Sequence, residues 1–190
     1  SHALTITEPV RFEEIEPRVF AVEGTPADCV NLAVGKLLPK PPDVVASGIN
    51  RGANVGDDIT YSGTVAGARE AAMLGVPALA ISLANKDERP DYTDAAHFGT
   101  MMAKILGEKQ SWGRRTFLNV NVPSAKVKGV RITAQGRSDY AAKAEESIDP
   151  RSRVYDWIKQ NFSRWERNGM SDIAAVRERF ISVTPLQFDF

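Results

Sequence analysis

Hydrophobic positions along this chain switch between two spacings, one typical of strands and the other of helices. Alternating or short continuous apolar runs predict strands, whereas apolar residues three and four positions apart predict helices. Strands are expected at residues 3–7, 18–22, 43–47, 76–82, 117–122, 130–136 and 181–190, and helices at residues 25–39, 64–74 and 94–106. Strands that alternate with helices form right-handed crossovers. We therefore expect an α/β fold with a parallel sheet covered on both faces, in three layers.

Helix boundaries are marked by specific residues. Thr25 is a candidate N-cap, Pro26 occupies the first helical position, and Asp28 has the spacing of a capping box. Gly75 is a candidate C-terminal cap for the alanine-rich helix that precedes it. The run DVVAS at residues 43–47 is expected to be buried on both faces, as in a parallel sheet.

The last third of the chain differs from the rest. Residues 137–172 are polar, with aromatic residues that lack helical spacing: Tyr140, Tyr155, Trp157, Phe162 and Trp165. Such a segment is typical of an extended arm or hairpin whose rings pack against a partner subunit, or of a long surface loop packed on its own domain. We expect two regions, an α/β core at 1–136 and an oligomerisation arm with a return strand at 137–190.

Composition excludes several function classes. The chain has 190 residues, 43% of them hydrophobic, and 24 basic residues balance 24 acidic ones. A balanced charge does not favour binding to a nucleic acid duplex or to an anionic membrane. No apolar run approaches the ~18 residues of a membrane span, and the single cysteine, Cys29, excludes an internal disulfide. We expect a cytoplasmic protein.

The segment SGINRGANVGDDITYSGTVAGA, residues 47–68, is the main candidate for a site. It lies between a predicted buried strand and a predicted helix, at the end of a parallel sheet where α/β proteins bind ligands. Ser62, Gly63 and Thr64 begin that helix, and their hydroxyl and N–H groups favour a phosphate. The alternative is that Ser62 or Thr64 only caps the helix.

The same segment contains candidate metal ligands. Asn50 directly follows the strand, and its carboxamide oxygen suits a hard cation. Asp57 and Asp58 are weaker candidates, because adjacent acids in a glycine-rich loop are commonly solvated or occupy a helix N-terminus. Gly48, Gly52 and Gly56 match no nucleotide-binding fingerprint and indicate only tight bends or the close approach of a ligand.

Together these motifs resemble the stationary-phase survival protein SurE family of metal-dependent 5'-nucleotidases. The resemblance includes VEGTPADCVNLAV, LGVPALAIS, FLNVNVP and ISVTPLQFDF, and so covers essentially the whole chain. It implies a Rossmann-like domain with a smaller β-rich C-terminal part, and an arm exchanged in a homodimer or homotetramer. It also implies hydrolysis of nucleoside monophosphates with Mg or Mn.

The resemblance assigns the metal to an aspartate pair in an NDDG motif, a serine in an RSG motif, and the asparagine of SGIN, which is Asn50. NDDG and RSGA are absent from these 190 residues, and Ser1 aligns just after the RSG serine. The expected missing piece includes a first strand and helix, whose loss would expose a sheet edge. A catalytically impaired module that binds nucleotides or assembles subunits, and a different enzyme on the same scaffold, stay open as alternatives.

Other polar residues have weaker claims to a role in the site. His2 is a candidate phosphate ligand because it follows the position of the RSG serine, and Arg51 is another because it follows Asn50. Cys29 is expected to be a buried, unreactive thiol. His97 is expected to be a surface or packing residue of its helix.

Overall fold

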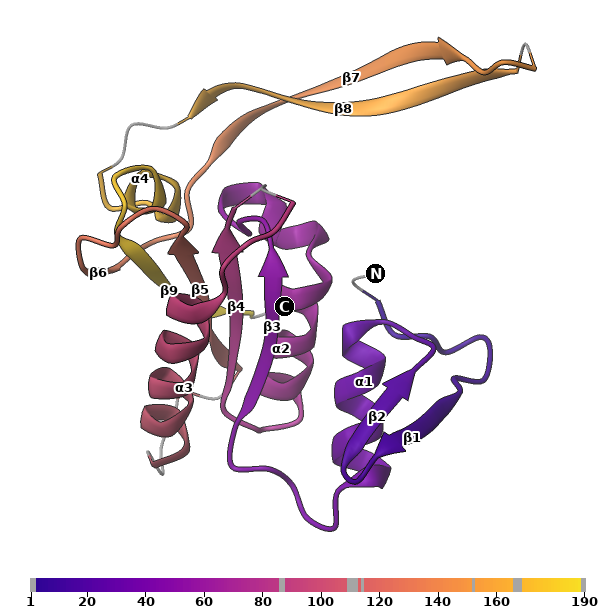
Figure 1. Cartoon of the computed structure of the whole chain (residues 1–190), viewed down its shortest axis with the longest axis vertical. Helices are drawn as coiled ribbons and strands as arrows, with labels where there is room; N and C mark the ends of the chain where they lie inside the picture. Colours follow the sequence, from indigo (N-terminus) through magenta and orange to yellow (C-terminus); the bar gives the residue numbers. More distant parts are fainter. Residues whose placement is uncertain are drawn as a thin grey trace.

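The computed structural model of the chain describes residues 3–85, 88–108, 113, 115–151, 153–165 and 169–188, with the backbone alone for 138–143 and 157–165. A five-stranded sheet forms the core, with helices on both faces (Figure 1). A small N-terminal hairpin and a long C-terminal hairpin lie outside this sheet. The predicted α/β class is confirmed.

The elements follow one another in an order close to the predicted one. The strands are β1 Phe12–Glu16, β2 Val19–Val22, β3 Val45–Arg51, β4 Ala78–Ala84, β5 Thr116–Pro123, β6 Val130–Ile132, β7 Ser138–Ile148, β8 Val154–Trp165 and β9 Ile181–Gln187. The α-helices are α1 Pro26–Leu32, α2 Gly63–Met73, α3 Thr93–Glu108 and α4 Asp172–Arg177. A π-helical turn, η1 Ala33–Leu37, extends α1, and a 3₁₀ helix, η2 Gly56–Tyr61, precedes α2.

The central sheet has the strand order β3-β4-β5-β9-β6. β3, β4 and β5 are parallel, β9 runs antiparallel to β5, and β6 runs parallel to β9. The sheet is therefore mixed, because the chain returns from the C-terminal hairpin to place β9 inside it. Within the described residues β3 pairs only with β4, so it is half-buried, and the expectation that residues 43–47 are buried on both faces is wrong.

The two faces of the sheet have different cores. Leu79, Ile81 and Leu83 of β4 pack toward α3, in a cluster of large aliphatic residues that includes Leu118 and Val120. On the other face Ala78 and Ala80 pack against α2, whose buried residues are also small: Val65, Ala68, Ala71 and Ala72. Small side chains on both elements bring α2 close to the strands.

Gly67 marks the closest approach of α2 to β3. A Cβ at this position would lie 2.7 Å from Ser47 Oγ and 3.3 Å from Pro26 Cβ. α2 is therefore packed between β3 and the beginning of α1. A further link between the helices is the hydrogen bond that Asn31 donates to the buried Glu70.

The start of α1 has the predicted capping box. The hydroxyl of Thr25 accepts from the N–H of Asp28 at 3.2 Å, and the Asp28 carboxylate accepts from the N–H of Thr25 at 2.8 Å. Asp28 also accepts two hydrogen bonds from Thr5, one from its N–H and one from its hydroxyl. The predicted strand at residues 3–7 is wrong, because this segment bonds to the capping residues instead of to another strand.

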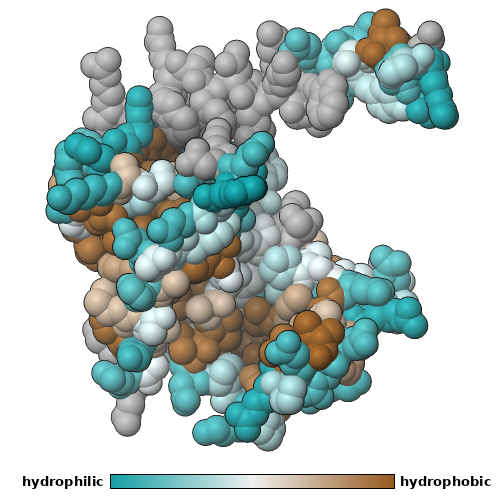
Figure 2. Space-filling view, viewed as in Figure 1, coloured by the Kyte–Doolittle hydropathy of each residue, from teal (hydrophilic) through white to brown (hydrophobic). Residues whose placement is uncertain are grey.

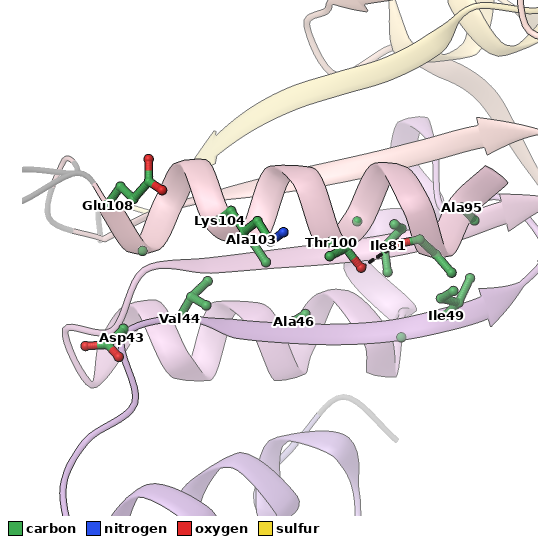
Figure 3. Close-up of a pocket in the computed structure, with 14 residues that line it drawn as sticks. Asp43, Val44, Ala46, Ile49, Ile81, Ala95, Thr100, Ala103, Lys104 and Glu108 are labelled. Atoms are coloured by element: carbon green, nitrogen blue, oxygen red, sulfur yellow. Dashed lines mark hydrogen bonds between the residues drawn. The ribbon is translucent and has the colours of Figure 1, made fainter. Parts of the chain in front are cut away.

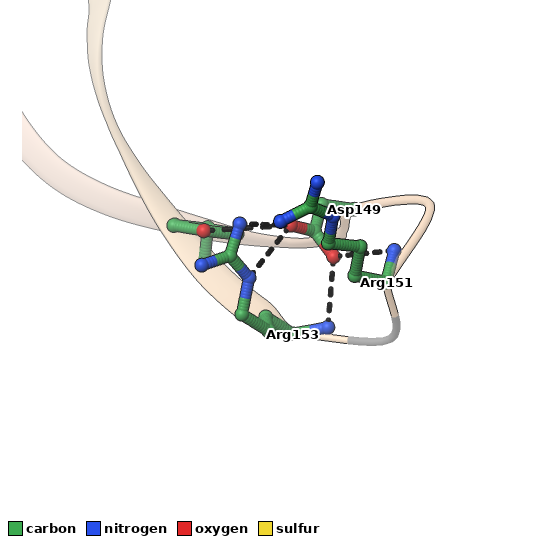
Figure 4. A network of polar contacts seen from close by, with 4 residues as sticks. Asp149, Arg151 and Arg153 are labelled. Carbon is green, nitrogen blue, oxygen red and sulfur yellow. Dashed lines mark hydrogen bonds and ion pairs between the residues drawn. The ribbon is translucent and has the colours of Figure 1, made fainter.

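The long hairpin of β7 and β8 projects away from the core (Figure 1). At its tip Asp149 accepts hydrogen bonds from the N–H groups of Arg151 and Arg153 and forms a 2.9 Å ion pair with the Arg153 guanidinium (Figure 4). The hydrogen bond from the Arg153 N–H is the main cause that lowers the pKa of Asp149. Of the five aromatic residues, the side chains of Tyr140, Trp157, Phe162 and Trp165 lie outside the described part, whereas Tyr155 is exposed.

One strand and one α-helix have no counterpart among the predicted elements, and one predicted strand is shorter than expected. β1 was missed because its sequence, FEEIE, is mostly acidic, although Phe12 meets Phe20 of β2 at 6.3 Å between ring centroids. α4 was missed because it is only six residues long. The strand expected at 130–136 ends at Ile132, where the chain turns toward the long hairpin.

Replacing Gly67 with alanine is expected to destabilise the protein by about 1–3 kcal/mol, because the added methyl overfills the contact with Ser47 and Pro26. The matched control is Gly35→Ala, where a Cβ meets nothing within 4 Å; this change is expected to stabilise by about 0.5–1 kcal/mol. Urea unfolding measures both, and Ser47→Ala is expected to relieve part of the Gly67→Ala loss. Equal effects of the two glycine substitutions would contradict this account.

Acid should remove a contribution of Asp28 to stability. Burial alone would raise the pKa of this carboxyl, but the hydrogen bonds from Thr5 and Thr25 outweigh it and lower the pKa to about 2. Because the folded pKa lies below the unfolded value, this stability is present above about pH 4 and is lost as the pH falls toward 2, by about 1–2 kcal/mol. Urea unfolding of the wild type and Asp28→Asn between pH 2 and 6 measures it: the difference between them should shrink in acid. Parallel curves would refute the assignment.

Candidate phosphate and metal site

The segment from Gly48 to Thr64 lies at the carboxyl ends of the parallel strands, as predicted from the sequence (Figure 1). Three glycines shape it, with positive φ angles of 136° at Gly48, 112° at Gly52 and 56° at Gly56. At Gly48 a Cβ would also collide with the carbonyl oxygen of Ile81. These positions therefore require glycine for the path of the backbone.

A register irregularity in β3 decides which way Asn50 faces. The pairing with β4 shifts between Ser47 and Asn50. Ser47 lies against α2, whereas Ile49 packs with the cluster on the α3 face. Ser47 and Ile49 would face the same side in a regular strand, but here they face opposite sides. Asn50 follows Ile49 and therefore faces the α2 side of the sheet.

Asn50 and the start of α2 are at similar heights along the strand direction. α2 runs antiparallel to β3, and Gly67 contacts Ser47. Gly63 lies one helical turn before Gly67, about 6 Å, and Asn50 lies three residues beyond Ser47, about 7–10 Å in the same direction. The strand end and the helix N-terminus therefore lie at one end of the α2–β3 pair.

Ser62 is the N-cap of α2. Its hydroxyl accepts from the N–H of Val65 at 3.2 Å, and its carbonyl accepts from Ala66 at 3.0 Å. The N–H groups of Gly63 and Thr64 come before the first intrahelical bond, so they remain available to an anion. Ser62 therefore caps the helix, but this does not decide whether it does only that, and a phosphate ligated by Ser62, Gly63 and Thr64 stays a prediction.

The side chain of Asn50 is held by one hydrogen bond within the loop. Its Nδ2 donates to the carbonyl of Gly52 at 2.9 Å, which directs Oδ1 away from that bond. A half-buried amide oxygen at a strand end fits one position in the coordination of a hard cation. The described residues contain no group of three or more acidic, histidine or cysteine side chains that could hold a metal ion, and a metal ligated by Asn50 stays a prediction.

The other predicted site residues are distributed differently. Arg51 ends β3 with an exposed side chain, and His2 lies outside the described residues. Asp57 and Asp58 form the first turn of η2 and are half-buried. Burial and the charge of Asp28 raise the pKa of half-buried Cys29, which disfavours a thiolate nucleophile, and His97 is exposed on α3, as expected.

A buried polar network holds the middle of the loop and was not predicted. Asn121 Oδ1 accepts from the N–H of Asn54 at 2.8 Å, and Asn119 and Asn121 both donate to the carbonyl of Asn54. Asn54 Nδ2 in turn donates to Ser82 Oγ at 2.7 Å. All four residues are buried. The sequence signal was present in FLNVNV, where two asparagines alternate with apolar residues in a strand.

The polar layer continues across the sheet. The hydroxyls of Thr133, Ser182 and Thr184 are buried and bond to one another at 2.7–3.3 Å. On the face of the sheet that α2 covers, the strands carry alanines beneath the helix. Beyond the N-terminus of α2, the same face carries hydroxyl and amide groups. Because buried polar groups require partners, this layer fixes the segments that cover it.

A groove of about 650 Å³ lies on the opposite face of β3, between that strand and α3 (Figure 3). Val44, Ala46 and Ile49 line one side and Ala103 and Thr100 the other. Apolar side chains gather on this face of the molecule (Figure 2). Since Asn50 faces the α2 side, the groove is separate from the candidate site.

No helix in the described ranges is long and apolar enough to span a membrane. A family model described as "Survival protein SurE" matches residues 1–142. Proteins named 5'-nucleotidase SurE are similar over nearly the whole chain. That of Syntrophotalea carbinolica is 48% identical over 189 residues, or 99% of this chain and 75% of the relative.

Two further similarities point the same way. The 5'-nucleotidase SurE of Geobacter sulfurreducens is 47% identical over 191 residues, covering 99% of this chain and 72% of the relative. The crystal structure of the SurE protein from Aquifex aeolicus superposes with a TM-score of 0.82 at 39% identity. That match covers 100% of this chain and 78% of the other.

Removing the amide of Asn121 is expected to destabilise the protein more than removing that of Asn54. Asn121→Ala leaves the buried N–H of Asn54 without its acceptor and should cost about 2–4 kcal/mol. Asn54→Ala removes one side-chain bond, to Ser82, and should cost about 1–2 kcal/mol. Urea unfolding gives both values, with Thr60→Ala in the same loop as an exposed control. A larger loss in Asn54→Ala would contradict this order.

Proposed function

Because the chain belongs to the survival protein SurE family, we propose that it is a 5'-nucleotidase, a phosphomonoesterase that hydrolyses nucleoside monophosphates to nucleoside and inorganic phosphate. The geometric observation that carries the proposal is the position of Asn50 and the open N–H groups of α2 at one end of the α2–β3 pair. A hard-cation ligand beside an anion-binding helix N-terminus suits phosphoryl transfer to water.

The phosphate is held by the first turn of α2 in this proposal. The N–H groups of Gly63 and Thr64 and the hydroxyls of Ser62 and Thr64 donate to its oxygens, with the positive end of the helix dipole behind them. These donors stabilise the negative charge that develops on the oxygens in the transition state. Ser62 contributes its hydroxyl proton while its oxygen continues to accept from Val65. Arg51 and His2 are further candidate contacts to the phosphate.

Asn50 contributes its side-chain oxygen to a divalent cation, Mg or Mn. When bound, such a cation polarises the phosphoryl group as a Lewis acid. The hydrogen bond to Gly52 keeps the Asn50 oxygen oriented before the cation arrives, which lowers the entropic cost of binding. Asp57 and Asp58 are not required for this role.

The proposal extends to assembly as a homodimer or homotetramer in the cytoplasm, through the arm formed by β7 and β8. The arm projects from the core and exposes Ile148, Val154 and Tyr155 near its tip. Apolar residues on a projecting hairpin favour burial against a second copy. The molar mass in solution, measured by light scattering, distinguishes two subunits from four.

The protein expressed from its complete reading frame should release phosphate from AMP or GMP in the presence of Mn²⁺. Asn50→Ala is expected to raise the Mn²⁺ concentration needed for half-maximal activity by about 10–100-fold, because one ligand is lost. Asn31→Ala serves as the control, since Asn31 bonds to Glu70 and not to the site.

Three results would count against the proposal. Nucleotide binding without phosphate release would favour a module that only binds or assembles. If the rate of phosphate release does not depend on Mn²⁺, the proposed role of a divalent cation is wrong. Unchanged Mn²⁺ dependence in Asn50→Ala would favour a different enzyme on this scaffold.

A further inference from the structure

The carboxylate of Asp172 lies where three segments of the chain meet. Its Oδ2 accepts from the N–H of Gly56 at 2.9 Å, and its Oδ1 accepts from Gly136 at 2.8 Å and from Ile173 at 2.7 Å. Gly56 begins η2, Gly136 precedes β7, and Ile173 belongs to α4. The side chain is completely buried.

Both glycines at this junction are sterically required. A Cβ on Gly56 would lie 2.9 Å from Ile173 Cδ1, and Gly56 has a φ of 56°. A Cβ on Gly136 would lie 2.6 Å from the same Ile173 atom and 2.9 Å from Asp172 Oδ1. The two backbones therefore approach the carboxylate closely, with Ile173 packed over them, and leave no space for another side chain.

Gly56 is held on both sides, at its carbonyl by the segment that leads into the arm and at its N–H by α4. Gln135 Nε2 donates to the Gly56 carbonyl at 3.0 Å, while Asp172 accepts from its N–H. The same segment is tied to α4, because the N–H of Asp172 donates to the Ala134 carbonyl at 2.9 Å. We call residues 134–136 the arm root.

The path from this junction to the phosphate ligands is short. Gly56 starts η2, which ends at Tyr61 and leads directly into Ser62, Gly63 and Thr64. The chain before Gly56 is fixed independently, by the asparagine network around Asn54. A displacement of Gly56 would therefore be transmitted toward the start of α2, while β3 and Asn50 stay in place.

We propose that Asp172 is a positioning residue for the phosphate site, and that it links the root of the β7–β8 arm to the loop that carries Ser62, Gly63 and Thr64. The kinetic test of this inference rests on the proposed nucleotidase function. The claim that Asp172 holds the loop in place does not depend on that function. Burial raises the pKa of Asp172, and the backbone donors oppose this by favouring the ionised carboxylate. The N–H groups of Gly56, Gly136 and Ile173 thus stabilise the negative charge of the Asp172 carboxylate.

Asp172→Asn tests the link. An amide retains the shape, but its NH₂ group would face a backbone N–H, so either Gly56 or Gly136 loses its acceptor. We expect KM for AMP to rise about tenfold, with a smaller change in kcat and an unchanged Mn²⁺ requirement. Gln135→Ala, which alters a more exposed side chain, should raise KM about threefold in the same direction.

Asp28→Asn is the matched control for stability. Asp28 is also a buried aspartate in the first turn of a helix that accepts backbone hydrogen bonds, but its donors, Thr5 and Thr25, do not belong to the phosphate loop. Its loss should destabilise the protein without changing KM. If Asp28→Asn raises KM as much as Asp172→Asn does, a general loss of stability explains the effect and the proposal is overturned.

Hydrogen exchange provides a readout that does not depend on activity. Amides of residues 56–66 should exchange at least tenfold faster in Asp172→Asn and Gln135→Ala, with β4 and β5 unchanged. Unchanged exchange of this loop would overturn the proposal even if KM rises. If the wild type releases no phosphate, the nucleotidase function fails, and the exchange measurement still decides whether Asp172 holds the loop. If Asp172→Asn does not fold, Gln135→Ala decides by the same two measurements.

Discussion

Buried hydrogen bonds to the backbone of one loop determine the arrangement of the candidate site. The loop between β3 and α2 covers a face of the sheet whose side chains are polar, and the amide groups of Asn119 and Asn121 bond to its backbone at Asn54. Asn119 and Asn121 hold Asn54, and Asp172 holds Gly56. An unsatisfied buried polar group is costly, so these bonds permit only one path for the chain. The path directs α2 with its N-terminus beside the end of β3.

Small residues complement this polar anchoring. Alanines of α2 and β4, together with Gly67, let the helix lie close to the sheet, so its N-terminus is set by packing as well as by the loop. Packing of this kind positions a site better than a flexible loop does. The helix that we propose donates to the phosphate is thereby part of the rigid core, although the residues of its first turn belong to the loop sequence.

Much of this arrangement was accessible from the sequence. Hydrophobic periodicity and helix-capping residues located the central strands, the capping box of α1 and the start of α2, because those signals depend on neighbouring residues. The parts that were missed depend on distant ones. The segment at residues 3–7 alternates like a strand but bonds to Asp28. Asn121 lies in a strand that the sequence predicts, yet its partner Asn54 is 67 positions away. Asp172 begins a helix too short to predict, and its contact with Gly56 spans 116 residues.

That separation of 116 residues has a consequence for the order of folding during synthesis. The strands β3, β4 and β5 can pair as soon as they leave the ribosome, since each follows the previous one along the chain. The loop before α2 reaches its final position only after Asp172 has been added, and the sheet is complete only when β9 enters between β5 and β6. Long-range contacts of this kind form late and slow the last step. A nascent chain interrupted before α4 would contain β3, β4 and β5 but would lack the carboxylate that holds the loop before α2.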